Sequence, residues 1–515
     1  MKRIFALTMI LILGCSVFVA CDKSDKADVV FDTVVSTSFD GLGVEWGVYE
    51  DVTKLAPNAQ ERTVAALNRL KPSLVRCMTN FDWIACNFDG KNTDDPSDDV
   101  WSYDFSNKYM QNCLQILDYC QDNGIKVAFG VWNIVGTTSG VEYVADGDKI
   151  TAVESNSVDW NMYQDVTSDI RWAKLTVDLL DYLINQHGYT CIKWWVNSNE
   201  PNWTGAVGSS KNAYNTYEKW QQGVLNVRNA LDEARLTDVD IVGGDTTGLL
   251  GSADYLTQIA TNIADVVDNY GVHMYISNYD IDSASYQSNI KQLFDGVKKI
   301  DDSLGKEKQM IIWEAGLLDG KNTTTDCNAY IANYSYGIRM ADFTLQSILA
   351  GVNGVVYWDL DDAMHYMYTE NGMTAKEWGM FSTLNSASAL LQEYRPWFHS
   401  SVLLTNLLRP GNAVYSTKES SESIRTLATV TKDGLNGGFV AVNRAKEAVT
   451  KSFCLQTEVK NDSNKLFVYI FNEQNLRLGS DGFVVPNLVA EGSINDVITM
   501  EIPANSMVIV SSGEL

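Results

Sequence analysis

Histidine and basic side chains are scarce in this chain of 515 residues, and each scarcity excludes a class of function. Only 4 histidines are present, which is too few for a histidine-rich metal site. Lys and Arg together number 39 against 65 Asp and Glu, so the formal net charge is −26. A chain of this charge repels the phosphate backbone of nucleic acids, and nucleic acid is therefore not an expected partner.

Cysteine is present, but not in the pattern of a metal cage. None of the 9 cysteines shows C-x-x-C spacing, which argues against a zinc site. Once Cys15 and Cys21 are assigned to an N-terminal signal, an odd number remains, which argues against a full disulfide framework. One disulfide bridge stays open as an alternative, and most of the thiols are expected to be buried.

Apolar residues, by contrast, are plentiful. A hydrophobic fraction of 45% with 20% charged residues is typical of globular proteins and excludes a disordered chain. At about 150 residues per domain, the length predicts two or three domains, or one large barrel with a companion domain. The 14 Trp and 24 Tyr supply flat, polar-edged surfaces that suit either a core or the stacking of sugars.

The N-terminus has the pattern of an export signal. Lys2 and Arg3 precede the apolar run Ile4–Leu13, which is typical of a secretory signal. Phe18 is too large for an ordinary A-x-A cleavage site, and the segment resembles a bacterial lipoprotein signal, in which cleavage falls before Cys21 and that cysteine is lipidated.

We therefore expect residues 1–20 to be a signal peptide and residues 21–30 a lipidated tether. The mature protein is expected to be exported and lipid-anchored in the bacterial cell envelope, at the outer membrane or cell surface. An uncleaved membrane anchor is the alternative, because Ile4–Ala20 reaches the lower limit of a membrane-spanning helix. The rest of the chain has no such apolar stretch.

Strands and helices alternate through most of the chain. Near-continuous apolar runs, typical of strands buried on both faces of a parallel sheet, begin at Gly41, Ser73, Ile125, Cys191, Val239, Tyr270, Gln309 and Gly354. Between them, helical periods are clear, as in Tyr286, Ile290, Leu293 and Val297. Eight strand–helix units predict an α/β fold, a (β/α)8 TIM barrel over residues 31–395. An open doubly wound sheet is the alternative, but it normally carries a glycine-rich phosphate loop.

The pattern changes near residue 396. Short β-rich runs separated by Gly, Asn, Asp and Lys turns predict an antiparallel β-sandwich domain over residues 396–515. Residues 31–38 are also strand-like and are expected either in the barrel domain or as a strand of the sandwich.

Polar residues follow several barrel strands at the point where each strand ends. Asn199 and Glu200 come directly after the fourth run, and Glu314 ends the seventh. The carboxyl ends of the strands form one rim, where barrels of this kind carry their active sites. Two carboxylates on one rim are the minimum equipment for cleaving a glycosidic bond, since one donates a proton and the other attacks the anomeric carbon.

The N-E-P after strand four together with a glutamate ending strand seven resembles the retaining glycoside hydrolases of clan A, and the layout is most similar to families 30, 39 and 51. The resemblance implies that Glu200 is the acid/base and Glu314 the nucleophile, and that Asn199 binds the sugar 2-hydroxyl. Clan A includes enzymes for several sugars. The resemblance therefore does not predict which sugar or linkage is cleaved, or whether the action is exo or endo.

The same resemblance implies roles for four further strand-end residues. Arg76 would lie beside the nucleophile and keep it ionised, and the hydroxyl of Tyr275 would touch it. His273 belongs to the same H-x-Y pattern, and Trp358 would form an aromatic floor beneath the sugar. Taken alone, each has an ordinary structural interpretation, such as a rim ion pair or a core side chain.

Other residues near the expected rim are weaker candidates. Trp132, Asn133, Glu45, Trp46 and Trp203 are predicted to contact substrate, against the alternative of local packing. Two acidic stretches, Asp89–Asp99 and the run from Asp359, lack EF-hand spacing and are expected to be solvated loops rather than calcium sites.

The predicted reaction is hydrolysis of a poly- or oligosaccharide by double displacement, with no cofactor and no metal. It requires the two carboxyl groups to lie about 5–5.5 Å apart. We expect Arg76 and Tyr275 to lower the pKa of Glu314, and the charge of Glu314 to raise that of Glu200. A non-catalytic carbohydrate-binding surface lipoprotein and a transglycosylase with the same residues are the alternatives.

Overall fold

The computed structural model of the chain describes residues 26–81, 85–89, 100–132, 142–146, 149–153, 170–202, 216–369, 372–385, 393–417, 424–460 and 464–515. The predicted signal peptide, Cys21, Asn133 and Trp203 lie outside these residues.

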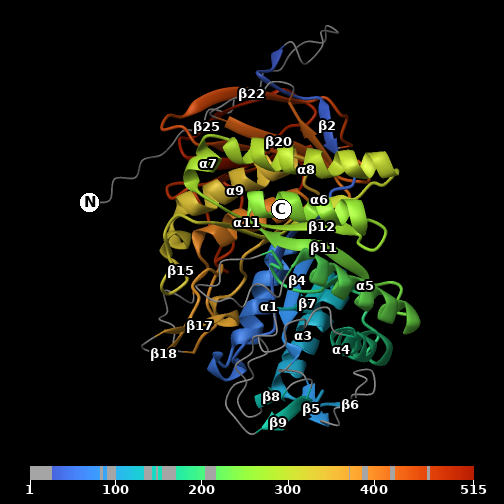
Figure 1. Cartoon of the computed structure of the whole chain (residues 1–515). Helices are drawn as coiled ribbons and strands as arrows, with labels where there is room; N and C mark the ends of the chain where they lie inside the picture. The colour runs from blue at the N-terminus through green and yellow to red at the C-terminus, as the bar shows by residue number, and fades with distance from the viewer. Residues whose placement is uncertain are drawn as a thin grey trace.

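A closed barrel of eight parallel strands forms the centre of the molecule (Figure 1). Its strands are β3 (Gly41–Glu45), β4 (Leu74–Thr79), β7 (Lys126–Val131), β10 (Ile192–Val196), β11 (Asp240–Thr247), β12 (Asn269–Ile276), β13 (Gln309–Leu317) and β16 (Gly354–Tyr357). Each strand coincides with one of the eight apolar runs, so the predicted (β/α)8 barrel is confirmed. Short hairpins β5–β6 (Ala85–Asp89, Val100–Tyr103), β8–β9 (Glu142–Asp146, Lys149–Val153), β14–β15 (Lys321–Asn322, Cys327–Asn328) and β17–β18 (Tyr366–Thr369, Gly372–Ala375) extend from it.

Helices surround the barrel. They are α1 (Ala59–Leu70), α3 (Lys108–Asp122), α4 (Ile170–Asp181), α5 (Tyr217–Glu233), α6 (Leu249–Asn262), α8 (Ser285–Leu304), α9 (Tyr334–Leu349) and α11 (Pro396–Leu407), with the short α7 (Asn278–Asp282) before α8. Helix α8 follows the predicted period, because Tyr286, Ile290 and Val297 are buried on its inner face. It ends at Gly305, whose left-handed φ of 68° closes the last turn.

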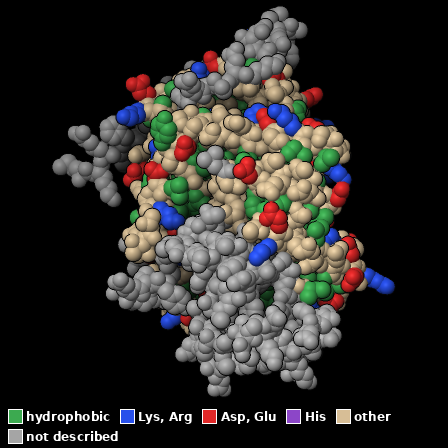
Figure 2. All heavy atoms as spheres, viewed as in Figure 1, with side chains coloured by type: hydrophobic (Ala, Val, Ile, Leu, Met, Phe, Trp, Pro, Cys, Tyr) green, Lys and Arg blue, Asp and Glu red, His purple; other side chains and the backbone are tan. Residues whose placement is uncertain are grey.

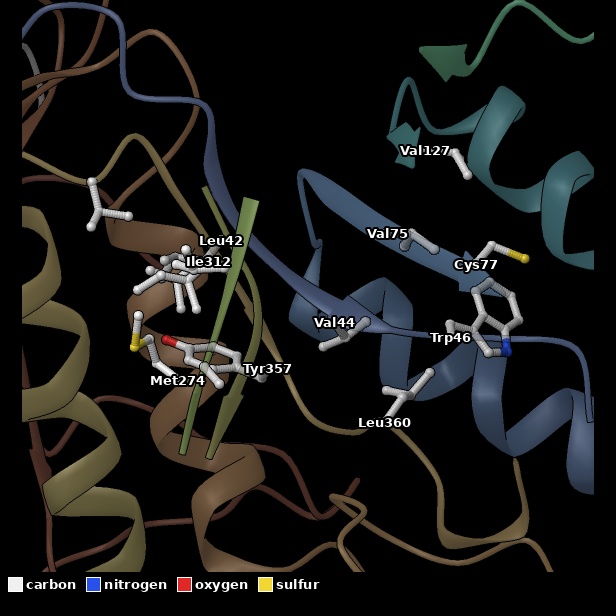
Figure 3. Packing of buried hydrophobic residues seen from close by; sticks show 14 of the residues in the cluster. Leu42, Val44, Trp46, Val75, Cys77, Val127, Met274, Ile312, Tyr357 and Leu360 are labelled. Carbon is white, nitrogen blue, oxygen red and sulfur yellow. The ribbon is translucent and has the colours of Figure 1, made fainter. Parts of the chain in front are cut away.

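Side chains alternate between the inside and the outside of the barrel wall. Along β4, Leu74 and Met78 join the apolar cluster inside the barrel, while Val75 and Cys77 face the helices. Figure 3 shows Val75 and Cys77 in this outer layer. Since strand side chains alternate with a period of two, Arg76 points inward with Leu74 and Met78. One arginine is thereby placed inside the barrel.

A second domain of two sheets packs on one side of the barrel (Figure 1). Its seven-stranded sheet has the order β2 (Thr33–Ser36), β19 (Ala413–Ser416), β20 (Ile424–Val430), β21 (Gly437–Asn443), β26 (Ser506–Ser511), β23 (Lys465–Phe471) and β24 (Leu488–Glu491). The three-stranded sheet is β1 (Val29–Phe31), β22 (Val449–Leu455) and β25 (Ile498–Ile502). Stacked rings of Phe31, Phe439 and Phe453 lie in the core between them.

The boundary between the domains lies later in the chain than residue 396. Residues Pro396–Leu407 form α11, which contacts α1 and α9 of the barrel, and the next sandwich strand begins only at Ala413. At the N-terminal side, β1 and β2 pair with β22 and β19, so both belong to the sandwich sheets.

Charged side chains are dispersed over the described surface in Figure 2, and basic side chains do not gather into a patch on that face. No helix among the described residues is both long enough and apolar enough to cross a bilayer. Free thiols are found at Cys77, Cys113, Cys120, Cys191, Cys327 and Cys454, and all of these except Cys327 are buried.

Candidate active site

The polar side chains predicted at strand ends come together at the carboxyl-terminal end of the barrel. Glu45 ends β3, Arg76 lies in β4, and Glu200 follows β10. His273 and Glu314 lie in the neighbouring strands β12 and β13. All of these side chains are more than four-fifths buried.

Irregular pairing directs two of these side chains to each other. Between β12 and β13, Val272 pairs with Ile312, but the next pair is His273 with Glu314, so Trp313 is an extra residue in β13. Bulges of this kind bend a strand and re-aim its side chains. His273 and Glu314 consequently lie opposite each other, with Nδ1 of the imidazole 3.5 Å from Oε2 of the carboxylate.

Both carboxylate oxygens of Glu314 are held in place. The Nη1 atom of Arg76 donates to Oε1 at 2.9 Å, and the hydroxyl of Tyr275 donates to Oε2 at 2.6 Å. The Glu314 side chain is 6% exposed. Its orientation is therefore fixed by two hydrogen bonds, one of them to a charged group.

Arg76 is the centre of a wider buried network. Its Nη1 also donates to Glu45 at 3.0 Å, and its Nη2 donates to Asn199 and to Asp245, each at 2.7 Å. One guanidinium thus contacts three carboxylates. Burial raises the pKa of Glu45 to about 8, although Arg76 partly opposes the rise, so this acid is mostly protonated at neutral pH.

Glu200 reaches the network from the segment that follows β10, two strands from β4 on one side and two from β12 on the other. Its φ of 44° lies in the left-handed region, and its backbone N–H donates to the carbonyl of Asp245 at 3.1 Å. Its Oε1 is 2.9 Å from Nδ1 of His273. One carboxylate oxygen of Glu200, one of Glu314 and a ring nitrogen of His273 all lie within 4.8 Å of one another.

Asp245 is a site residue that sequence reasoning missed. It is the extra residue where β11 pairs with β12, between the pairs of Gly244 and Thr246, and its φ is 56°. Its Oδ2 accepts a hydrogen bond from Nη2 of Arg76, and its Oδ1 lies 2.9 Å from Nε2 of His273. One sequence signal points to the position of Asp245, since it comes directly after the fifth apolar run, but its contact with Arg76 has no such signal.

The predicted order of the two glutamate pKa values is wrong for the unliganded protein. Burial raises the pKa of Glu314 more than His273 and Arg76 lower it. Burial also penalises charge on Glu200, but the hydrogen bond and the charge of His273 outweigh that penalty and lower its pKa. The reasons are the burial of Glu314 and the orientation of His273, neither of which a sequence pattern reveals.

His273 itself favours its charged form. Burial lowers its pKa, but Asp245 and then Glu314 raise it further, to about 10. Asp245 is the matching anion: burial disfavours its charge, yet Arg76 and His273 lower its pKa to about 2. An imidazolium between carboxylates is therefore the expected state of the free site.

Aromatic rings border the site. The ring of Trp132 is perpendicular to that of Trp358 at 5.8 Å, and the Arg76 guanidinium lies 5.1 Å from the Trp132 ring. His365 stacks on Trp358 at 4.7 Å. Trp132 is partly exposed and Trp358 is 7% exposed, so both are near the carboxylates but only Trp132 offers much surface.

Trp46 does not belong to the aromatic rings that border the site. It is 1% exposed and packs edge-on against Tyr119 of α3, with ring centroids 5.7 Å apart. Figure 3 shows it beside Cys77 in the layer between barrel and helices. Because it follows Glu45, which points inward, Trp46 points outward, and the prediction that it contacts substrate is not supported.

The acidic run from Asp359 is not a solvated loop, contrary to expectation. Asp359, Asp361 and Asp362 are each at most 1% exposed. Asp361 accepts a hydrogen bond from Tyr49 at 2.9 Å, and Asp362 pairs with Arg395 at 2.6 Å. Asp361 and Asp362 are therefore structural partners of buried groups. The other acidic stretch, Asp89–Asp99, lies almost wholly outside the described residues.

By geometry alone, Glu200, His273 and Glu314 could offer three ligand atoms to a cation. The hydrogen bonding points elsewhere, because both oxygens of Glu314 already accept from Arg76 and Tyr275. A ring nitrogen that carries a proton is also unable to ligate a metal. The donor set fits a proton network, and we assign no metal ligand here.

No protein-family model matches the chain, and no curated protein matches it at a significant level. Solved structures do match. A GH30 endoxylanase from Clostridium papyrosolvens C71 is 13% identical, with a TM-score of 0.57 over 95% of this chain and 99% of that one. A GH39 β-xylosidase from Caulobacter crescentus is also 13% identical, with a TM-score of 0.57 over 94% and 99%. A conserved exported protein from Bacteroides fragilis is 14% identical, with a TM-score of 0.60 over 94% and 99%.

At these identities the likeness shows the fold. The chain has the barrel-and-sandwich architecture of the family 30 and family 39 structures, so the predicted resemblance to clan A is confirmed at that level.

Proposed function

We propose that the protein is a retaining glycoside hydrolase that cleaves β-glycosidic bonds of a poly- or oligosaccharide, with Glu314 as nucleophile and Glu200 as acid/base. The observation that carries the proposal is the closeness of two carboxylates from different strands, with oxygens within 4.8 Å. Carboxyl groups of retaining enzymes lie about 5–5.5 Å apart, whereas inverting enzymes separate them by about 6.5–9.5 Å to admit a water.

In the first step, Glu314 attacks the anomeric carbon and Glu200 protonates the departing oxygen. Arg76 and Tyr275 hold the attacking carboxylate in one orientation, which limits the entropy lost on reaching the transition state. Asn199 is held by Arg76 at 2.7 Å and is adjacent to Glu200, which suits it to bind a hydroxyl of the reacting sugar.

In the second step, Glu200 takes a proton from water, and that water releases the sugar from Glu314 with retained configuration. Glu200 must then be a carboxylate. The lowered pKa of Glu200 in the free protein suits this base role, and the proton needed in the first step must come from the surrounding network.

The residues are compatible with several sugars. Two structures with the same fold are named as an endoxylanase and a β-xylosidase, so β-xylosides and xylan are the first substrates to test. Trp132, which is partly exposed, supplies an apolar surface against which the ring of a sugar can stack.

The assignment of the two glutamates can be tested with Glu200→Ala, Glu314→Ala and added azide on a dinitrophenyl glycoside. Each variant should lose most of its activity. Azide should rescue Glu200→Ala with a β-glycosyl azide as product, because azide then intercepts the glycosyl-enzyme. It should rescue Glu314→Ala with an α-glycosyl azide, because azide then replaces the nucleophile. NMR of the anomeric proton identifies the product.

A matched control is Asp359→Asn, which changes a buried acid after β16 that forms no hydrogen bond with either glutamate. It should show no azide rescue. If wild-type protein binds oligosaccharides in calorimetry but releases no product from xylosides, glucosides, galactosides, mannosides or arabinosides, the hydrolase proposal fails and a binding protein remains.

We also propose that the protein is exported and lipid-anchored at Cys21. The supporting observation is the sequence Phe18–Cys21 after a positively charged, apolar N-terminus. Wild-type protein expressed in a Gram-negative host should incorporate radiolabelled palmitate and sediment with membranes, whereas Cys21→Ser should do neither. Labelling of both would contradict the assignment of Cys21.

A further inference from the structure

We propose that the proton taken up by the departing oxygen is stored on His273 in the free enzyme and reaches that oxygen through Glu200, with Asp245 holding the ring. This inference rests on the proposed hydrolase function and adds a source for the catalytic proton. His273 acts through Glu200 and does not itself touch the substrate.

The argument starts from the two ring nitrogens. Nδ1 of His273 lies 2.9 Å from a carboxylate oxygen of Glu200, and Nε2 lies 2.9 Å from one of Asp245. A neutral imidazole has only one N–H, so its other nitrogen would face a carboxylate oxygen lone pair to lone pair. Both contacts become hydrogen bonds only when one extra proton is present, either on the ring or on one of the two carboxyl groups.

The surroundings decide where that proton rests. His273 faces Glu200 after β10, Asp245 of β11 and Glu314 of β13, while Tyr275 of its own strand donates to Glu314. Arg76 of β4 contacts Asp245 and Glu314 and does not contact the ring. Three anions around one buried ring favour the imidazolium, which agrees with the direction of its pKa.

The same arrangement couples proton delivery to nucleophilic attack. When Glu314 forms its bond to the anomeric carbon, it loses the negative charge that lies 3.5 Å from Nδ1. The imidazolium is then less favoured, and its proton moves across the 2.9 Å contact to Glu200. The bond from the anomeric carbon to the departing oxygen breaks as that oxygen takes the proton from Glu200.

The proton count balances over the cycle. After the first step, His273 is neutral with its remaining proton on Nε2 facing Asp245, and Glu200 is an ionised base. In the second step Glu200 takes a proton from water, Glu314 is freed as a carboxylate, and the proton returns to Nδ1. The network begins and ends in the same state.

The first test compares leaving groups in Asp245→Asn. An asparagine amide facing Nε2 favours the neutral ring, which removes the stored proton. Hydrolysis of an alkyl glycoside or disaccharide, whose leaving oxygen needs protonation, should fall at least 10 times more than hydrolysis of a dinitrophenyl glycoside, which needs none. The alkaline limb of kcat/KM should move to lower pH.

The matched control is Glu45→Gln, which also contacts Arg76 but lies outside hydrogen-bonding distance of His273. Its losses should be equal for both leaving groups. If Asp245→Asn likewise loses activity equally on both substrates with an unchanged alkaline limb, Asp245 is merely structural and the proposal fails.

A second measurement leaves the protein unmutated. The chain has 4 histidines, so nitrogen-15 labelling of histidine gives few ring signals, and the neutral rings of His365 and His399, whose pKa values are lowered by burial, provide references. The His273 ring should be doubly protonated in free enzyme at pH 7.5 and neutral after Glu314 is trapped with a 2-fluoro glycoside. A neutral ring in the free enzyme, or an unchanged ring after trapping, overturns the proposal. Failure to trap at all counts against the hydrolase function instead.

Discussion

Two buried clusters of arginine and carboxylate are built from the same residue types in opposite proportions. In the barrel, Arg76 contacts three acids, Glu45, Asp245 and Glu314. At the contact between barrel and sandwich, one acid, Asp342 of α9, pairs with two arginines, Arg425 of β20 and Arg444 after β21.

The ratio of acids to arginines differs between the two clusters, and so does their role: one is proposed to perform chemistry, and the other joins the two domains. Where acids outnumber cations in a buried space, protons must be retained, and Glu45 and His273 both have raised pKa values. Protons that are retained at neutral pH can also be moved. At Asp342, burial raises the pKa of the one carboxylate and two guanidinium groups oppose that rise. This cluster serves to join a helix of one domain to the strands of another.

The largest contrast should come from Glu314→Gln. Loss of the nucleophile should reduce kcat/KM for a β-glycoside by a factor on the order of 10⁴ or more. The melting temperature should stay the same or rise, because a buried acid leaves an acid-rich cluster. A variant that lost activity only because it unfolded would show a lower melting temperature by calorimetry and would contradict this account.

Asp342→Asn should have the opposite profile. Removing the one acid leaves two buried arginines without a charged partner, which costs about 3–5 kcal/mol of unfolding free energy. kcat/KM of the folded protein should change by less than about twofold. Urea unfolding and kinetics on the same sample measure both.

The control for that variant is Asp295→Asn on α8, which breaks an exposed pair with Lys291. Its cost should be below about 0.5 kcal/mol. Equal losses in Asp295→Asn and Asp342→Asn would show that burial of the pair is not what matters.

The sequence predicts the barrel well because its information is local. Each of the eight strands is a continuous apolar run, and a buried parallel strand requires such a run. Strand alternation could also have excluded Trp46, since it follows Glu45 and adjacent side chains point to opposite faces. That rule was available from the sequence alone.

The contacts between site residues could not be predicted from the sequence, because they form only when the barrel closes. Asp245 meets Arg76 across 169 positions of the chain, and a bulge places it there. The reversed order of the glutamate pKa values follows from burial of Glu314 and from the direction of the His273 ring. Neither quantity is a property of a sequence motif.

A smaller effect is expected from Glu45→Gln, and it should depend on pH. Glu45 has a pKa of about 8 in the folded protein against 4.5 for the ordinary group, so the folded state binds the extra proton between these values. Wild-type stability therefore falls as pH rises from about 4.5 to about 8. Glu45→Gln has no ionisable group at this position, so its stability should not fall for this reason.

The difference in melting temperature between Glu45→Gln and wild type should be near zero at pH 4.5 and should grow in favour of the variant up to pH 8. Activity near pH 6 should stay within about tenfold of wild type, because glutamine resembles the protonated acid. A variant that is less stable than wild type at pH 8 would mean that Glu45 is ionised and needed by Arg76.

The smallest effect concerns an exposed pair across the same domain contact that Asp342 secures. Arg69 of α1 pairs with Asp481 at 2.6 Å, and both side chains are about half exposed, at 52% and 47%. The Arg69 guanidinium also lies 4.9 Å from the ring centroid of Phe483.

Asp481→Asn should cost no more than about 0.5 kcal/mol in urea unfolding, since solvent screens the charge. Arg69→Ala should cost more, about 1 kcal/mol, because it also removes the contact with the ring. If Asp481→Asn cost as much as Asp342→Asn, the attachment of the domains would depend on charge at the surface as much as in the interior, and the contrast between the two buried clusters would lose its meaning.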